Sequence, residues 1–121
     1  MAKIERFEDL QSWQKARQLA NTVYALSANS RFKRDFRLTN QIRDAAGSVM
    51  HNIAEGFDAG THPEFIRFLK ISRRSASEVQ SQLYLALDRA YISQEELTGT
   101  YAMATETKRL INGMIAYLRS C

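Results

Sequence analysis

Apolar side chains recur every three or four residues along most of the chain, and polar residues interrupt this spacing at three places. Such spacing is typical of amphipathic helices. We therefore expect four helices, over residues 9–29, 39–56, 62–90 and 94–119. Because the connections are short, consecutive helices should pack antiparallel. The pattern predicts an all-α protein of a single domain, residues 1–121, folded as an up-down-up-down antiparallel four-helix bundle.

Start and stop signals mark the second of these helices. Thr39 is a suitable N-terminal cap, and Gly56 is well placed to end the helix in the left-handed conformation. The polar, basic segment before the helix contains two aromatic residues, Phe32 and Phe36. We expect both rings to tuck against the end of the bundle.

Capping boxes predict the starts of the third and fourth helices. The Thr61 hydroxyl can accept from the Glu64 amide while the Glu64 carboxylate accepts from the Thr61 amide. Ser93 and Glu96 have the same spacing before the fourth helix. These local signals favour helix starts next to Thr61 and Ser93.

Composition agrees with a compact helical domain. The chain has 121 residues, of which 45% are hydrophobic and 25% charged, and it contains one Pro and five Gly. Its single cysteine, Cys121, excludes an intramolecular disulfide. The first residues lack the apolar region of a signal peptide, and no stretch approaches the length of a membrane span. We therefore expect a cytoplasmic location and no membrane contact.

The net charge of +4 favours anionic partners. Cationic side chains neutralise phosphates and release counterions, which gives affinity without sequence information. The alternative is that these residues form an ordinary solvated helix face. The candidate residues fall into one group before and within the second helix and one group in the third: Arg31, Lys33, Arg34, Arg37 and Arg43, then Arg67, Lys70, Arg73 and Arg74.

A polar edge follows the apolar stripe of the second helix. Ser48, Asn52 and Glu55 occupy successive turns and should point into a boundary between helices. They could orient one another or reach an arginine of the third helix. This edge could serve in recognition, or it could be structural, because buried polar groups are normally paired within a fold.

No motif for catalysis, cofactor binding or metal binding is visible. The sequence lacks the Glu-x-x-His pairs of di-iron bundles, a glycine-rich phosphate loop and a Gly-x-Ser-x-Gly elbow. His51 and Glu55 are four residues apart but have no partner motif. We therefore expect a protein that is not an enzyme and has no cofactor and no metal.

Four motifs together resemble one family, the bacterial four helix bundle proteins, also called intervening-sequence proteins of 23S ribosomal RNA. The motif that contains Asn52, Glu55 and Gly56 stands in register with the one around Trp13. The motifs are Phe7-x-x-Leu10-x-x-Trp13-Gln14-Lys15-Ala16, Leu38-Thr39-x-Gln41-Ile42-Arg43, Asn52-Ile53-Ala54-Glu55-Gly56 and Glu64-Phe65-x-Arg67-Phe68-Leu69.

This resemblance implies an up-down four-helix bundle that assembles into a ring, typically a pentamer, with a role in binding RNA or DNA. Distant relatives are accessory proteins of diversity-generating retroelements, in which a basic pentamer engages nucleic acid and a polymerase. Two positions depart from the family pattern: Ala59 stands where an Arg is usual, and Arg74 precedes Ser75 where a Gly is usual.

The sequence and the resemblance together predict a non-enzymatic oligomeric module that binds RNA, DNA or a nucleoprotein partner through its basic surface. A nucleic-acid-processing protein is a further expected partner. The alternative is a bundle that only contacts other proteins. The resemblance favours a cyclic homo-oligomer, most typically a pentamer. Apolar residues outside the four stripes form either a wider core or a subunit interface of such an assembly. They are Tyr24, Phe57, Ile66, Ile71, Tyr84 and Leu87.

Overall fold

The computed structural model describes residues 3–121, whose regular elements are all helical. A short 3₁₀ turn, η1 (Phe7–Asp9), is followed by α1 (Gln11–Leu26), α2 (Ser30–Arg34), α3 (Phe36–Asp58), α4 (His62–Asp88) and α5 (Gln94–Ser120). The expected all-α fold is confirmed, with one additional helix, α2, between the first two of the expected four. Met1 and Ala2, the first residues of the segment in which we expect no signal peptide, lie outside the described residues.

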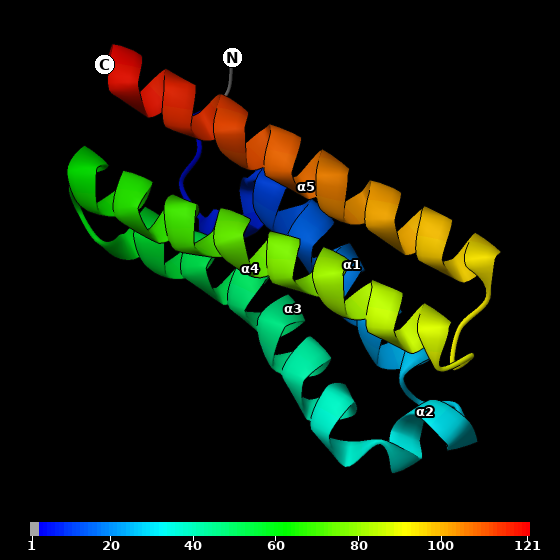
Figure 1. The fold of residues 1–121 in the computed structure, drawn as a ribbon. Helices are drawn as coiled ribbons and strands as arrows, with labels where there is room; N and C mark the ends of the chain where they lie inside the picture. Colours follow the sequence, from blue (N-terminus) through cyan, green and yellow to red (C-terminus); the bar gives the residue numbers. More distant parts are fainter. Residues whose placement is uncertain (1–2) are drawn as a thin grey trace.

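Four helices form the bundle, and each packs against two neighbours. α3 packs on α4, α4 packs on α5, and α1 packs on both α3 and α5. Chain direction alternates from helix to helix around this arrangement (Figure 1). The antiparallel topology that the short connections predict is therefore confirmed. α2 lies at one end of the bundle, beside the start of α3.

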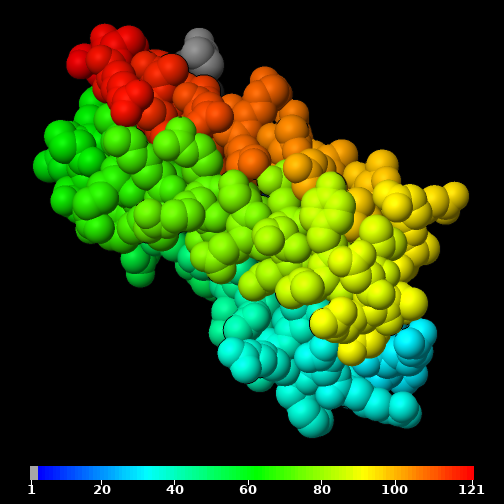
Figure 2. Space-filling model, viewed as in Figure 1, coloured from blue at the N-terminus to red at the C-terminus, as the bar shows by residue number. Residues whose placement is uncertain are grey.

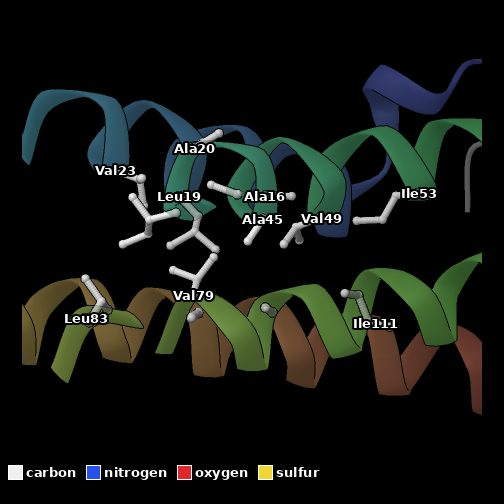
Figure 3. Packing of buried hydrophobic residues seen from close by; sticks show 14 of the residues in the cluster. Ala16, Leu19, Ala20, Val23, Ala45, Val49, Ile53, Val79, Leu83 and Ile111 are labelled. Carbon is white, nitrogen blue, oxygen red and sulfur yellow. The ribbon is translucent and has the colours of Figure 1, made fainter. Parts of the chain in front are cut away.

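The core lies between a layer formed by α1 and α3 and a layer formed by α4 and α5 (Figure 3). Leu19 and Val49 from the first layer face Val79 from the second. Leu69 is also fully buried, whereas the neighbouring Phe68 is only partly buried. The largest fully buried apolar side chains are Phe32, Leu19, Ile42, Ile53, Leu69, Leu83, Ile111, Val23, Val49 and Val79.

α1 ends three residues earlier than predicted, because two polar side chains redirect the backbone. The Ser27 hydroxyl donates to the Val23 carbonyl at 2.7 Å. Asn29 then accepts from the Phe32 amide at 2.9 Å and thereby caps α2. Residues 30–34, predicted as a loop, form this short helix instead.

The cap of α3 is Asp35, and the prediction of Thr39 is wrong. Asp35 Oδ1 accepts from the Leu38 amide at 3.1 Å, so α3 begins at Phe36. Thr39 lies one turn inside the helix, where its buried hydroxyl donates to the Phe32 carbonyl at 2.9 Å. Of the two expected tucked rings, Phe32 is buried and Phe36 is exposed.

Gly56 does not end α3, and that prediction is also wrong. The residue is buried within the helix, and a Cβ there would lie 2.8 Å from Phe68 Cβ and 2.9 Å from Phe65 Cδ1. Its role is to let α3 and α4 approach closely. The left-handed residue after the helix is Gly60, with φ +92°.

The capping predictions for the last two helices differ in outcome. Thr61 Oγ1 accepts from the Glu64 amide at 3.3 Å, but the Glu64 carboxylate accepts from Arg67 and does not return to Thr61. Ser93 and Glu96 form the complete box, with distances of 3.1 and 2.8 Å. The starts of α4 and α5 were thus placed correctly.

Candidate nucleic-acid interface

The predicted basic residues occupy two separate places. One group surrounds α2 and the start of α3, at one end of the bundle, and the other lies along α4. Figure 2 shows the α2 end below a face that α4 and α5 cover side by side. The two groups therefore do not form one continuous cluster in the fold.

Two members of the first group make contacts within the protein. Arg31 donates to the carbonyls of Ala90 and Arg89 at 3.3 and 3.4 Å, which ties α2 to the connection between α4 and α5. Arg43 Nε donates to Ser27 Oγ at 2.8 Å, and its guanidinium lies 4.6 Å from the centre of the Tyr24 ring. These two arginines hold elements together.

The other three members remain available to a ligand. Lys33, Arg34 and Arg37 are exposed, and within residues 3–121 their side chains form no hydrogen bond or ion pair. Asp35, between them, already accepts from the Leu38 amide and from the Tyr91 hydroxyl. The hydrogen bond from the Tyr91 hydroxyl to Asp35, together with partial burial and the negative charge of Asp35, raises the pKa of Tyr91.

In the second group, Arg67 differs from its neighbours on α4. Arg67 pairs with Glu64, with an Nη2 to Oε2 distance of 3.0 Å, and it lies over the Phe68 ring at 4.5 Å. Its charge is thus largely balanced within the first turns of α4.

Lys70, Arg73 and Arg74 line an open groove between α4 and α5. Lys108, from α5, completes the lining with Ser77 and Asn112. We call this surface the α4–α5 basic groove: Lys70, Arg73, Arg74, Ser77, Lys108 and Asn112. It carries four cationic side chains and no carboxylate.

Neutral partners position two of the four cations. Arg73 Nη1 donates to Asn112 Oδ1 at 2.7 Å, and Lys108 Nζ donates to Ser77 Oγ at 3.2 Å. Both contacts cross from α4 to α5, one turn apart in each helix, as antiparallel packing requires. Because Asn112 and Ser77 are uncharged, they orient the cations without neutralising them.

The opposite side of α4 has a different charge. The groove between α3 and α4 is lined by Asp44 and Glu78 together with uncharged polar residues, which are Gln41, Ser48, Ser75 and Gln82. α4 therefore separates a cationic groove from one that carries two carboxylates. An anionic ligand would favour the α5 side.

The three residues of the predicted polar edge on α3 have different surroundings in the structure. Ser48 Oγ lies 2.8 Å from Ser75 Oγ, and Asn52 Nδ2 donates to the Ser48 hydroxyl at 2.9 Å and to its carbonyl at 2.8 Å. Ser48 and Asn52 thus orient one another, and the partner on α4 is a serine, not an arginine. Glu55 is exposed and forms no hydrogen bond or ion pair within the described chain.

Sequence reasoning missed Lys108, the fourth cation of the groove. Its position depends on which residues of α4 and α5 face each other. The only signal in the sequence was the antiparallel pairing of the two helices.

Residues 3–121 contain no group of three or more His, Cys, Asp or Glu side chains placed to hold a metal ion. No helix in this part of the chain is long and apolar enough to span a membrane.

Residues 8–113 match the family model of the 23S rRNA-intervening sequence protein. The chain belongs to this family. The match agrees with the motifs around Trp13 and Asn52, and it extends through most of α5, for which no motif was recognised. Next to Arg74, the Ser75 hydroxyl lies 2.8 Å from the Ser48 hydroxyl on α3, so α3 and α4 are in contact at this position.

A solved structure has the same fold. It is a protein of unknown function from the S23 ribosomal protein family of Bacteroides thetaiotaomicron, similar to this chain with a TM-score of 0.79 and 24% sequence identity. The similarity covers 87% of this chain and 95% of the other. At this identity the likeness concerns the fold. A search among curated proteins gives no match to this chain.

Proposed function

We propose that this protein is a non-enzymatic, oligomeric module that binds the phosphate backbone of RNA or DNA through the α4–α5 basic groove. The observation that carries this proposal is the meeting of Lys70, Arg73, Arg74 and Lys108 in one groove without a carboxylate. A nucleic-acid-processing protein could share the complex.

The chemistry of the groove suits phosphate. Arginine and lysine side chains neutralise phosphates and release condensed counterions, and this process gives most of the affinity of sequence-independent binding. Arg73 and Lys108 are oriented by Asn112 and Ser77 before a ligand arrives. Less side-chain freedom is then lost on binding than with unrestrained cations.

Self-association would strengthen this binding. Tyr24, Tyr84 and Leu85 are large apolar side chains that lie about half exposed on the helix faces. Exposed apolar groups of this size favour contact between subunits. Following the family resemblance, the assembly is a cyclic homo-oligomer, with a pentamer favoured. Repetition of one weak phosphate site around a ring raises affinity by avidity.

The test is the salt dependence of binding to a fluorescent RNA and to a DNA of the same sequence. A variant with Lys70, Arg73, Arg74 and Lys108 all changed to Gln should bind more weakly. The slope of log K against log salt should also fall, by about 0.7 to 0.9 for each phosphate that the variant no longer neutralises.

The matched control removes four cations that already have partners in the protein. Arg6, Arg67 and Arg109 pair with glutamates, and Arg17 lies over the Trp13 ring. Changing these four to Gln lowers the net charge by the same amount as the groove variant. Because the α4–α5 basic groove stays intact, most of the slope of log K against log salt should remain. Equally weakened binding by both variants, or no retention of RNA or DNA by the wild type at low salt, would favour a bundle that contacts only proteins. A concentration-independent monomer in analytical ultracentrifugation would contradict the oligomer.

A further inference from the structure

Phe36 is the most exposed large apolar side chain of those described, with 74% of its surface accessible. It is the first residue of α3, at the bundle end where α2 lies. Phe32, four residues earlier, is 1% exposed and stacks on Tyr91 with ring centres 5.3 Å apart. One ring of this segment thus anchors it, while the other extends into solvent.

The exposure of Phe36 does not come from a loosely held backbone. Asp35 caps the helix start through the Leu38 amide, and the Thr39 hydroxyl bonds the Phe32 carbonyl. Asn29, at the start of α2, bonds the Tyr91 carbonyl at 2.9 Å. The ring therefore stands on a backbone that is fixed on both sides.

Cationic residues precede and follow Phe36 in the sequence. Lys33 and Arg34 end α2, and Arg37 directly follows Phe36. None of the three has a partner within the described residues. The one carboxylate between residues 29 and 43 is Asp35, and both of its oxygens accept hydrogen bonds from the protein.

An exposed aromatic ring among free cations matches the chemistry of an unpaired nucleotide. The base can stack on the ring, and the flanking phosphates can contact the cations. In a duplex both faces of every base except those of the two terminal pairs are covered by neighbouring bases, so a duplex offers the ring far less base surface than a single strand. A protein partner would use the apolar ring but has no general need for three cations.

We propose that Phe36, Lys33, Arg34 and Arg37 form a second nucleic-acid site, in which one unpaired base stacks on the Phe36 ring. This inference rests on the proposed function because it takes nucleic acid as the ligand. It goes further by naming single-stranded RNA or DNA as the class that this end of the bundle selects. The α4–α5 basic groove, by contrast, contacts backbone phosphate of either form.

The experiment compares the affinities of a labelled 12-nucleotide single-stranded RNA and its blunt duplex for the full chain. Phe36→Leu keeps an apolar side chain but removes the aromatic face. It should weaken single-strand binding by about 5- to 150-fold, which corresponds to the loss of one stacked base, and change duplex binding far less. Phe36→Trp should restore single-strand binding, and its added fluorescence should be quenched by the single strand.

Tyr117→Leu is the matched control, since Tyr117 is 62% exposed but lies near the end of α5. It should change neither affinity. Because the Phe36 ring is exposed, the thermal midpoint of Phe36→Leu should equal that of the wild type, which excludes misfolding as the cause of weaker binding.

The outcomes separate the two proposals. Unchanged single-strand binding by Phe36→Leu, while the groove variant binds more weakly, overturns the stacking site alone. A fall in sedimentation mass of Phe36→Leu without RNA also overturns it, because the ring would then belong to a contact between copies. Failure of the wild type to bind either RNA overturns both proposals.

Discussion

The hydroxyl oxygens of Ser48 on α3 and Ser75 on α4 lie 2.8 Å apart. Ser75 is buried and Ser48 partly buried, and Asn52 donates to the Ser48 hydroxyl from the next turn of α3. Another polar contact lies nearby, where Ser72 Oγ donates to the Val49 carbonyl at 2.6 Å. Polar side chains thus join the two helices within an otherwise apolar interface.

Ser48→Ala and Ser75→Ala should therefore interact energetically. Each change alone leaves the other hydroxyl without this partner and should cost about 1 kcal/mol or more of unfolding free energy. The double variant should cost less than the sum of the single variants, with a coupling of about 0.5 to 1.5 kcal/mol. Urea denaturation of the four proteins measures this cycle. Simple additivity would show that the hydrogen bond contributes nothing to stability.

Gly56→Ala should destabilise the protein although alanine is the better helix former. The added Cβ would meet Phe68 Cβ at 2.8 Å and the Phe65 ring at 2.9 Å. Such overpacking costs about 1 to 3 kcal/mol and should exceed the gain in helix propensity. Gly113→Ala, on α5 with no atom within 4 Å of the new Cβ, should instead stabilise by about 0.5 to 1 kcal/mol. If both variants were more stable in thermal melts, α3 and α4 would not pack this closely.

Ala90→Gly should raise stability. Ala90 has φ +58°, and the amides of Ala90 and Tyr91 bond the carbonyls of Leu87 and Ala86, which closes α4 in a Schellman motif. The left-handed conformation costs an L-residue about 1 to 2 kcal/mol, partly offset by the greater freedom of glycine in the unfolded chain. We expect a net gain of up to about 1 kcal/mol. Ala59→Gly, at φ −72°, should show no gain in the same denaturation experiment.

Tyr91 should make stability depend on alkaline pH. Its hydrogen bond to Asp35 raises the pKa of Tyr91 above the ordinary value of 10.0. The folded state therefore favours the protonated phenol, and this stabilisation is complete below pH 10 and lost as the pH rises through the folded pKa. The difference in thermal midpoint between wild type and Tyr91→Phe should be constant from pH 7 to 9 and shrink above pH 10. A difference for Tyr91→Phe that persisted at pH 11 would contradict this linkage.

The helix starts that sequence reasoning placed best are those with purely local signals. Thr61 and Ser93 cap their helices as predicted because a cap needs only residues within one turn. Asp35 was overlooked in favour of Thr39, although both are suitable cap residues. The choice between them depends on the burial of Phe32 and on the Tyr91 contact, which come from distant parts of the chain. Gly56 was misread for the same reason, because its neighbours Phe65 and Phe68 belong to the next helix.

The sequence identified most of the cationic residues of the candidate site, but it did not show which of them meet in one groove. Lys70, Arg73 and Arg74 were recognised because they lie close together in one helix. Lys108 lies beside them because of how α4 and α5 are aligned along their lengths. The pattern of apolar residues does not determine this alignment to within one helical turn. Arg31 and Arg43, which are among the predicted binding candidates, also bond backbone carbonyls and a serine within the protein, and no sequence pattern predicts these internal contacts.

The contact of Arg31 with the carbonyls of Arg89 and Ala90 limits how copies of this chain can exchange parts. Helical bundles can swap domains when a connection straightens and fuses two helices into one. Here the connection between α1 and α3 contains α2, capped by Asn29 and bonded to the connection at the far end of α4. Straightening it would break these bonds and expose Phe32 to water. A swap through this connection is therefore disfavoured, and each subunit of an assembly should keep its own α1.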